Sequence, residues 1–265
     1  MYFDYGRSSY YKSLSAEVAY VLEEEIVCKL VHGIRRYQPN IGGKKLYHLL
    51  KEDLYKLDGS IGRDKFFDIL RKRGLLVKRK RKYMYTTDSF HRFRVYKNSL
   101  KNRLLTGPNQ ACVSDITYLR IRSGFVYLFL ITDAYSRKIT GWSLSDSLSI
   151  EGCLKALHMA IKQCLDTTGL IHHSDRGIQY CSNDYVALLK RHKMTISMTE
   201  ENHCYENAIA ERVNGILKQD FLLDETFKNR SIAHSAIKEA IETYNTRRPH
   251  WSLNLCTPEQ IHNAA

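Results

Sequence analysis

Three acidic residues in the second half of the chain have the settings of a metal-dependent catalytic site. Asp115 falls inside a stretch with the pattern of a β-strand, where an aspartate is disfavoured and is costly to bury without a partner. Asp175 closely follows a short apolar strand, and α/β sheets bind ligands at their strand ends. Glu211 lies in a helical stretch of small apolar residues, which favours a helix face packed on the sheet. Taken singly, Asp175 could be a turn or N-cap residue and Glu211 a surface acid, so the three are judged together.

Carboxylates that meet at one point would bind Mg²⁺ or Mn²⁺, because hard oxygen ligands suit these ions better than they suit zinc. Two such ions, about 3.5–4 Å apart, would clamp the attacking and leaving oxygens of an in-line phosphoryl displacement. The ions would also relieve the repulsion by which neighbouring carboxylates raise one another's pKa. Between Asp115 and Asp175 lie 59 residues, and between Asp175 and Glu211 lie 35. The sequence therefore predicts a two-metal phosphoryl-transfer site built from these three acids.

The elements that must position the three acids form an α/β pattern. Three strands joined by short connections favour an antiparallel meander, and helices and strands then alternate. In a mixed sheet of this kind the first strand could lie centrally with the fourth beside it, and a crossing helix would bring in Glu211. The predicted strands cover 113–119, 124–131, 138–144, 170–173 and 195–198, and the predicted helices cover 149–163, 183–190, 207–221 and 232–244.

The first part of the chain has a helical pattern, with helices predicted over 15–31, 44–51 and 63–73. Two short helices joined by a turn and flanked by basic residues fit a helix-turn-helix, although any small helical bundle would look similar. A basic run follows, and such a linker would lie along DNA phosphates. We therefore predict a helix-turn-helix-like region over 1–77, a basic linker over 78–107 and a catalytic core over 108–265. The predicted DNA-binding residues of the linker are Lys78, Arg79, Lys80, Arg81 and Lys82.

Charge and composition narrow the class of protein. Residues 1–107 hold 24 basic and 11 acidic residues, whereas residues 108–265 hold 17 of each, so the whole net charge of +13 lies in the first part. A basic region joined to a neutral one suggests a polyanion binder, although a basic solubility surface is the simpler alternative. The seven cysteines show no C-x-x-C spacing, which argues for free thiols in a reducing cytosol. No apolar run approaches the roughly 18–20 residues of a membrane span, and no signal peptide is apparent, so we expect no membrane association.

Residues 109–260 carry an ordered series of motifs around the three acids. The motifs are Asn109-Gln110, Ser114-Asp115-Ile116-Thr117-Tyr118, Asp133 to Trp142, Gly169 to Gly177 with Gln179-Tyr180, Asn202, Cys204-Tyr205, Asn207-Ala208, Glu211, Lys218, Tyr244-Asn245, Arg247, His250 and Thr257-Pro258. The series resembles the D…D(35)E core of retroviral-type integrases and is most similar to the OrfB-type transposases of bacterial insertion sequences (the IS-three family). Departures from the family pattern at Cys112, Glu206 and Arg212, where Trp, Asp and Ser are usual, touch none of the three acids.

The resemblance implies an RNase H-like fold in which Asp115, Asp175 and Glu211 bind two divalent ions, Mg²⁺ or Mn²⁺. It implies cleavage of double-stranded DNA at the ends of an insertion sequence and transfer of the freed 3′-OH to a second phosphodiester. The protein would act in the bacterial cytoplasm, at the nucleoid, as a homo-oligomer that holds two ends. It would also imply an upstream-frame OrfA protein as partner, or an OrfAB frameshift fusion, because this chain shows no zipper of its own.

Three further residues are candidates for DNA contact. Lys218 lies seven residues, or two turns, after Glu211 and so shares its helix face, where it could contact a phosphate. Asn207 lies one turn before Glu211 and could orient that acid, contact DNA or cap the helix. Arg247 follows the last long helix, where domain packing is the alternative to the DNA contact that the resemblance suggests.

Two other functions remain open from the sequence. A metal nuclease on the same fold would cut DNA without joining it. A DNA-binding regulator with an inactive core would bind DNA through the basic region alone, although the intact acids count against that alternative.

Overall fold

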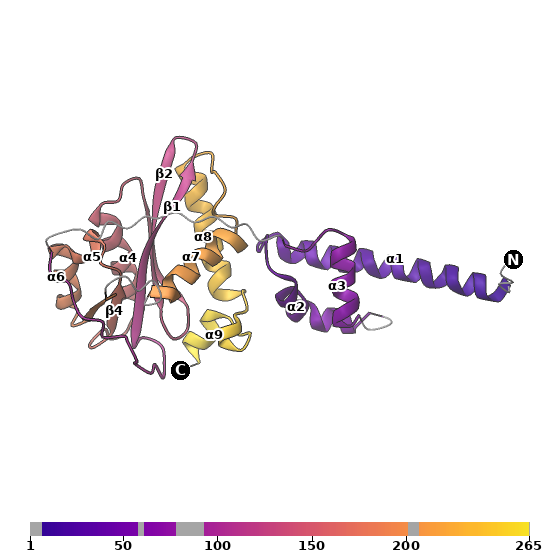
Figure 1. Cartoon of the computed structure of the whole chain (residues 1–265), viewed down its shortest axis with the longest axis horizontal. Helices are drawn as coiled ribbons and strands as arrows, with labels where there is room; N and C mark the ends of the chain where they lie inside the picture. Colours follow the sequence, from indigo (N-terminus) through magenta and orange to yellow (C-terminus); the bar gives the residue numbers. More distant parts are fainter. Residues whose placement is uncertain (1–6, 58–60, 78–92, 201–206, 265) are drawn as a thin grey trace. The chain divides into compact units, whose positions relative to one another are not determined.

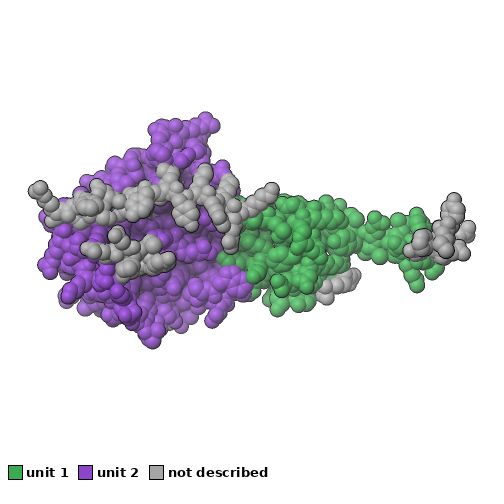
Figure 2. All heavy atoms as spheres, viewed as in Figure 1, with its two compact units in different colours: residues 1–80 green, residues 81–265 purple. Residues whose placement is uncertain are grey.

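The computed structural model describes residues 7–57, 61–77, 93–200 and 207–264. The chain divides into two compact units, residues 1–80 and 81–265, which we describe separately (Figure 2). The basic run from Lys78 to Lys82 lies outside the described residues, so its predicted role as a DNA-binding linker stays a prediction.

The first unit contains three helices, α1 (Arg7–Arg35), α2 (Gly43–Tyr55) and α3 (Arg63–Lys72). Their apolar stripes meet in one core, as the helical spacing of the sequence predicts. Helix α1 is longer at both ends than the predicted 15–31. The sequence pattern did not mark the added residues as helical because they are exposed or lie at the margin of this core. The buried core side chains include Val27, Val31, Leu46, Leu50, Leu54, Phe66, Ile69 and Leu70.

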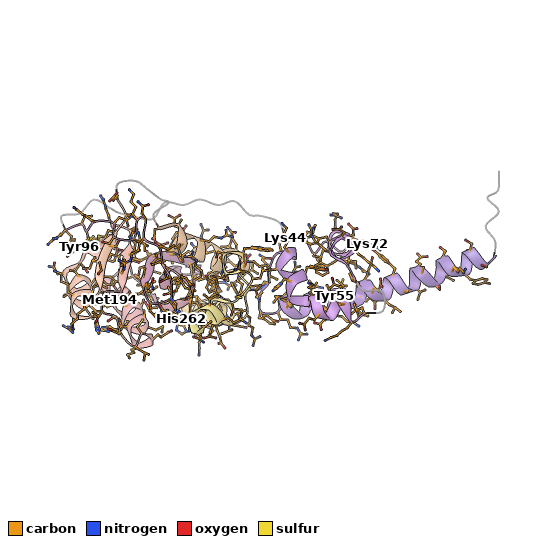
Figure 3. The ribbon with its side chains drawn as sticks, turned by 90° about the horizontal axis from the view of Figure 1, so that it is seen from below. Lys44, Tyr55, Lys72, Tyr96, Met194 and His262 are labelled. Carbon is orange, nitrogen blue, oxygen red and sulfur yellow. The ribbon has the colours of Figure 1, made fainter. Side chains whose placement is uncertain are left out.

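A buried carboxylate ties α1 to the end of α3. Glu24 is only 1% exposed and accepts hydrogen bonds from Lys72 Nζ at 2.5 Å and Arg73 Nε at 3.1 Å, with Lys72 labelled in Figure 3. These two cations lower the pKa of Glu24 against the opposing effect of burial. The unit is thus held by an apolar core and a charge-assisted link across it.

The second unit is built on a five-stranded mixed sheet with the order β3-β2-β1-β4-β5. Figure 1 labels β1, β2 and β4 of this sheet. Strands β1, β2 and β3 pair antiparallel, whereas β4 pairs with β1 and β5 pairs with β4 in parallel. This arrangement confirms the predicted mixed α/β fold, with the first strand central and the fourth beside it. The strands are β1 (Ala111–Ile121), β2 (Gly124–Asp133), β3 (Ile139–Ser145), β4 (Ile171–Ser174) and β5 (Thr195–Met198).

Helices cover both faces of this sheet, because alternate residues of its strands face opposite layers. Leu128 packs in one cluster with α7 (Ala208–Asp220) and α8 (Arg230–Thr246), and its neighbour Phe129 packs in another with α4 (Ile150–Gln163) and α6 (Asn183–Arg191). Three short elements were not predicted, because each is too short to show a helical period. They are α5 (Ile178–Cys181), the 3₁₀ turn Trp251–Leu253 and α9 (Pro258–Asn263).

Membrane-spanning segments were also sought among the helices. Within the described ranges, none is both long and apolar enough to cross a bilayer.

Candidate active site

Strand pairing brings Asp115 and Asp175 to neighbouring positions. In the parallel pair of β1 and β4, Val113 lies opposite His173, and the same offset carried two residues further places Asp175 level with Asp115. Residues at equivalent positions of adjacent strands project to the same face of a sheet. Strand β4 ends at Ser174, one residue before Asp175, whereas β1 continues to Ile121. The two carboxylates therefore lie next to each other at the end of β4, beside the middle of β1.

Hydrogen bonds orient both carboxylates. Asp115 Oδ2 accepts a hydrogen bond from Asn214 Nδ2 of α7 at 2.7 Å, and its Oδ1 accepts one from the Ile116 backbone N–H at 2.9 Å. Asp175 Oδ1 accepts a hydrogen bond from the backbone N–H of Gly177 at 3.0 Å. A Cβ atom at Gly177 would lie only 3.0 Å from that oxygen, so a residue without a side chain suits this close approach.

The pKa shifts show that the three acids act on one another. Burial and then the negative charge of Asp175 are the main causes that raise the pKa of Asp115, and the charge of Glu211 adds a smaller rise. The hydrogen bonds from Asn214 and Ile116 act in the opposite direction, and the resulting pKa of Asp115 is about 7. Burial and then the charge of Asp175 also raise the pKa of Glu211. The neighbouring negative charges thus make ionisation of Asp115 and Glu211 harder, an effect that a bound cation would reverse.

The third acid stands apart from the other two. Glu211 lies in the first turn of α7 and is exposed. Among the residues that the structure describes, no group of three or more His, Cys, Asp or Glu side chains is arranged to hold one ion. Glu211 therefore lies within electrostatic range of the pair but not in a formed coordination shell with it. The donor set itself, three carboxylates without nitrogen or sulfur ligands, suits Mg²⁺ or Mn²⁺.

Asn214 is a site residue that the sequence analysis missed. It lies one turn after Glu211 on α7 and is 7% exposed, and its Nδ2 binds Asp115 as described above. Its Oδ1 accepts no hydrogen bond from any described residue. The available signal was its spacing of three residues from Glu211, which puts both on one helix face.

Two predicted DNA contacts lie beside the acids. Lys218 Nζ lies 4.6 Å from the centre of the Tyr118 ring, and partial burial lowers the Lys218 pKa while Asp115 and Asp224 oppose that shift. Asn207 is 5% exposed, and its Nδ2 donates to the backbone oxygen of Ser114 at 3.1 Å. Asn207 occupies the N-cap position of α7, but its side chain accepts no capping hydrogen bond. This placement favours a role in positioning α7 over direct contact with DNA.

The third predicted DNA contact, Arg247, lies at the end of α8 and is exposed. Its neighbour Arg248 is only 2% exposed and donates to Asp220 Oδ2 from Nη2 at 2.7 Å and from Nε at 3.0 Å. Asp220 is the last residue of α7, so this ion pair fixes the far end of the helix that carries Glu211, Asn214 and Lys218.

Behind the acids, a buried histidine links three elements. His172 Nε2 lies 2.8 Å from Ser114 Oγ and 2.9 Å from the Tyr185 hydroxyl. Burial and then the nearby His173 lower the pKa of His172 to about 3, so the ring is neutral. It serves as a hydrogen-bonded part of the sheet that carries Asp115 and Asp175.

Comparisons with known proteins agree with this geometry. A protein-family model described as "Integrase core domain" matches residues 106–204, and a second with the same description matches residues 192–258. The 31 kDa protein of insertion element IS600 from Shigella sonnei is 37% identical over 211 residues, covering 77% of this chain and 78% of that protein. Transposase InsF for insertion sequence IS3A from Escherichia coli K12 is 38% identical over 196 residues, covering 73% of this chain and 68% of that protein.

A solved intasome structure shares the fold of the chain. The simian T-cell lymphotropic virus intasome in complex with the PP2A regulatory subunit B56 gamma aligns with a TM-score of 0.52 and 14% identity, over 88% of this chain and 74% of that chain. The HTLV-2 integrase catalytic core domain in complex with magnesium aligns with a TM-score of 0.47 and 21% identity, over 59% of this chain and 98% of that chain. The RNase H-like, retroviral-integrase-like core that the sequence predicts is therefore confirmed. With relatives 37% and 38% identical over about three quarters of its length, the chain belongs to the family of IS3-type insertion-sequence transposases with an integrase-like core.

Proposed function

We propose that this DNA transposase cuts and joins DNA strands at the ends of an insertion sequence by phosphoryl transfer that depends on divalent cations. The observation that carries the proposal is the parallel pairing of β1 with β4, whose register, extended two residues beyond Val113 and His173, sets Asp175 level with Asp115. The coupling of both to Glu211, and the integrase core and transposase relatives, support the same class of reaction.

In this proposal Asp115, Asp175 and Glu211 hold two Mg²⁺ or Mn²⁺ ions. When bound, such ions stabilise the charge on the attacking and leaving oxygens of a phosphoryl displacement. Asn214 keeps one oxygen of Asp115 in a fixed direction. Lys218, held near Asp115, supplies positive charge to a phosphate beside the scissile bond.

The reaction has two displacements at phosphorus. In the first, a water oxygen attacks the phosphodiester at the end of the element, the bond from phosphorus to the 3′ oxygen breaks, and that oxygen takes up a proton. The products are a 3′-OH on the element and a 5′-phosphate on the flanking strand. In the second, the 3′-OH attacks another phosphodiester, so one bond forms, one breaks and a new 3′-OH is released. The number of phosphodiesters is unchanged in this second step, and no bond between enzyme and DNA is required.

The partners follow from this reaction. The substrate is double-stranded DNA, both at the ends of the element and at the target, and its location places the protein in the bacterial cytoplasm at the nucleoid. Holding two ends at once calls for a homo-oligomer on DNA. An upstream-frame OrfA protein, or an OrfAB fusion, would supply recognition of the ends.

The test uses the full chain with DNA that carries the ends of its own element, with and without Mg²⁺ or Mn²⁺. Asp175→Asn is compared with Asp184→Asn, which changes an exposed aspartate in the first turn of α6. We expect metal-dependent joining in the wild type and in Asp184→Asn, and none in Asp175→Asn. Both strand cutting and strand joining are measured.

The same assay separates the two alternatives. Cutting without joining would identify a metal nuclease. Binding that needs no metal, without cutting, would indicate an inactive core or a missing upstream partner. Repeating the assay with the OrfAB fusion distinguishes these, because the fusion restores joining only if the core is active.

A further inference from the structure

Helix α1 carries a second apolar stripe on the side that faces away from its own unit. Val27 and Val31 are fully buried against α2 and α3. Val18 and Leu22 precede them by nine residues each, which is about two and a half turns, and so lie on the opposite side of the helix. We call the exposed set on that side the outer stripe. Its members are Tyr10 (63% exposed), Tyr11 (65%), Leu14 (45%), Val18 (55%), Val21 (42%) and Leu22 (55%).

The outer stripe lies mostly on a length of α1 that extends beyond α2 and α3, as Figure 1 shows. A free helical segment of this length is only marginally stable in water, because helix nucleation is costly. Large apolar side chains gathered on one face of such a segment mark an interaction surface. No other described residue of the unit buries this stripe.

We propose that the outer stripe pairs with the same stripe of a second copy of this chain, with the two α1 helices antiparallel. A two-fold axis level with residue 16 sets Leu14 against Val18, Tyr11 against Val21, and Tyr10 against Leu22. Every member of the stripe then meets another member, which is the self-complementarity that an isologous dimer requires. The seam covers positions 10–22, about 18 Å of helix at 1.5 Å per residue.

The charged residues of α1 favour antiparallel over parallel pairing of the two helices. Glu25 is exposed and lies seven residues, or two turns, after Val18, on the side of the outer stripe. In the antiparallel register, Glu25 lies level with Arg7 of the other α1, a residue of opposite charge. Opposite charges at facing positions attract each other. A parallel pair would instead set Glu25 against Glu25, with like charges opposed.

The test measures the association of the full chain by sedimentation between about 1 and 100 μM without DNA, so it does not depend on the proposed catalytic function. We expect a monomer–dimer equilibrium in the wild type. Leu14→Lys and Val18→Glu, each alone, should weaken it about tenfold or more, because each buries a charge in the seam. Ala16→Lys is the matched control, since it adds the same charge at an exposed position on the other side of the helix.

The double variant Leu14→Lys/Val18→Glu tests the register. In the antiparallel pair the new ammonium at position 14 meets the new carboxylate at position 18, so dimerisation should return. A wild type that is monomeric at 100 μM would overturn the proposal, as would a Leu14→Lys variant that dimerises like the wild type. An equal loss in Ala16→Lys would overturn the assignment to the outer stripe, and a double variant that stays dissociated would overturn the antiparallel register. Circular dichroism of each variant verifies that the helices are retained.

Discussion

The carboxylate of Asp115 depends on a neutral amide for its orientation. Asn214 Nδ2 holds one of its oxygens at 2.7 Å, and Asn207 Nδ2 holds the backbone oxygen of the preceding Ser114 at 3.1 Å. Two asparagines of one helix segment thus fix the side chain and the main chain of neighbouring residues in β1. A neutral donor can orient a carboxylate without cancelling the charge with which it would bind a cation.

Removing this amide should weaken metal binding before it affects the fold. We expect Asn214→Leu to lower Mn²⁺ affinity and the rate of strand joining by about 10- to 100-fold, the usual cost of losing a group that orients a metal ligand. Titration calorimetry with Mn²⁺ and the joining assay measure the two effects. Gln219→Leu, an exposed change on the same helix, is the control. Unchanged Mn²⁺ affinity in Asn214→Leu would show that Asp115 does not need the amide.

The buried His172 should make the core unit sensitive to acid. Its pKa falls from 6.5 to about 3 on folding, so between these values the unfolded chain binds a proton that the folded chain does not. The contribution of the neutral His172 to the free energy of unfolding is therefore complete above pH 6.5 and is lost as pH falls toward 3. At pH 5 the free energy of unfolding has fallen by about 2 kcal/mol from this cause. We expect the loss of unfolding free energy between pH 7.5 and 5 to be smaller by this amount in His172→Gln, measured by urea unfolding.

The exposed His158 provides the comparison, because His158→Gln changes a histidine on the surface of α4. A pH dependence in His172→Gln equal to that of the wild type would assign the acid sensitivity to other groups.

The three acids could be proposed as a site from the sequence, whereas the groups that hydrogen-bond to them could not. An aspartate within a strand, or directly after an apolar strand, is unusual enough to be noticed. An asparagine in an amphipathic helix is ordinary, so Asn214 becomes informative only when α7 is placed against β1. The buried ion pair of Arg248 with Asp220 was missed for the same reason, because it joins residues 28 positions apart.

At the scale of elements, the periodic pattern of apolar residues and the length of each helix or strand determined which elements could be predicted. The strands were predicted because their apolar residues are β-branched or aromatic and because short turns separate them. Helix α5 spans four residues and α9 spans six, which is too short for a periodic pattern. The start of α1 was misplaced because residues 8–19 are exposed in the described part of the unit, so no buried stripe marks the beginning of the helix.

Substitution of two glycines by alanine should have opposite effects on the stability of the core unit. A Cβ atom at Gly141 of β3 would lie 2.2 Å from the backbone oxygen of Ala156 in α4, so Gly141→Ala should lower the free energy of unfolding by about 3 kcal/mol. At Gly215, inside α7, a Cβ atom meets nothing within 4 Å, so Gly215→Ala should raise it by about 0.5–1 kcal/mol. Urea unfolding followed by the fluorescence of Trp142 measures both. Equal stability of the two variants would contradict the close packing of β3 on α4.

At the scale of the whole molecule, charge and chemistry are separated along the chain. The entire excess of positive charge precedes residue 108, and the three acids all follow it. Under the function proposed above, changes in the basic region should therefore mainly alter DNA affinity, whereas changes at the three acids should mainly alter strand joining.

The basic run gives this separation a measurable form. Replacing Lys78, Arg79, Lys80, Arg81 and Lys82 by glutamine should weaken DNA binding at low salt. It should also reduce the slope of log affinity against log salt by up to about 4.5, because each phosphate contact contributes roughly 0.9. Fluorescence anisotropy across a KCl series measures the slope. The control replaces Lys155, Lys162 and Lys190 of the core unit by glutamine. An equal change of the salt slope in this control would show that residues 78–82 do not contribute more to DNA binding than other lysines.

The pairing of β1 with β4 determines how this enzyme can vary in length. Because Asp175 is aligned with Asp115 through strand register, the number of residues between them has no direct chemical meaning. Loops such as the tip of the β1–β2 hairpin can gain or lose residues while the two acids stay level. A slip of β4 by one position would instead turn Asp175 to the other face of the sheet with no change in composition. The proposed site therefore depends on the alignment of two strands and not on the number of residues in the loops between them.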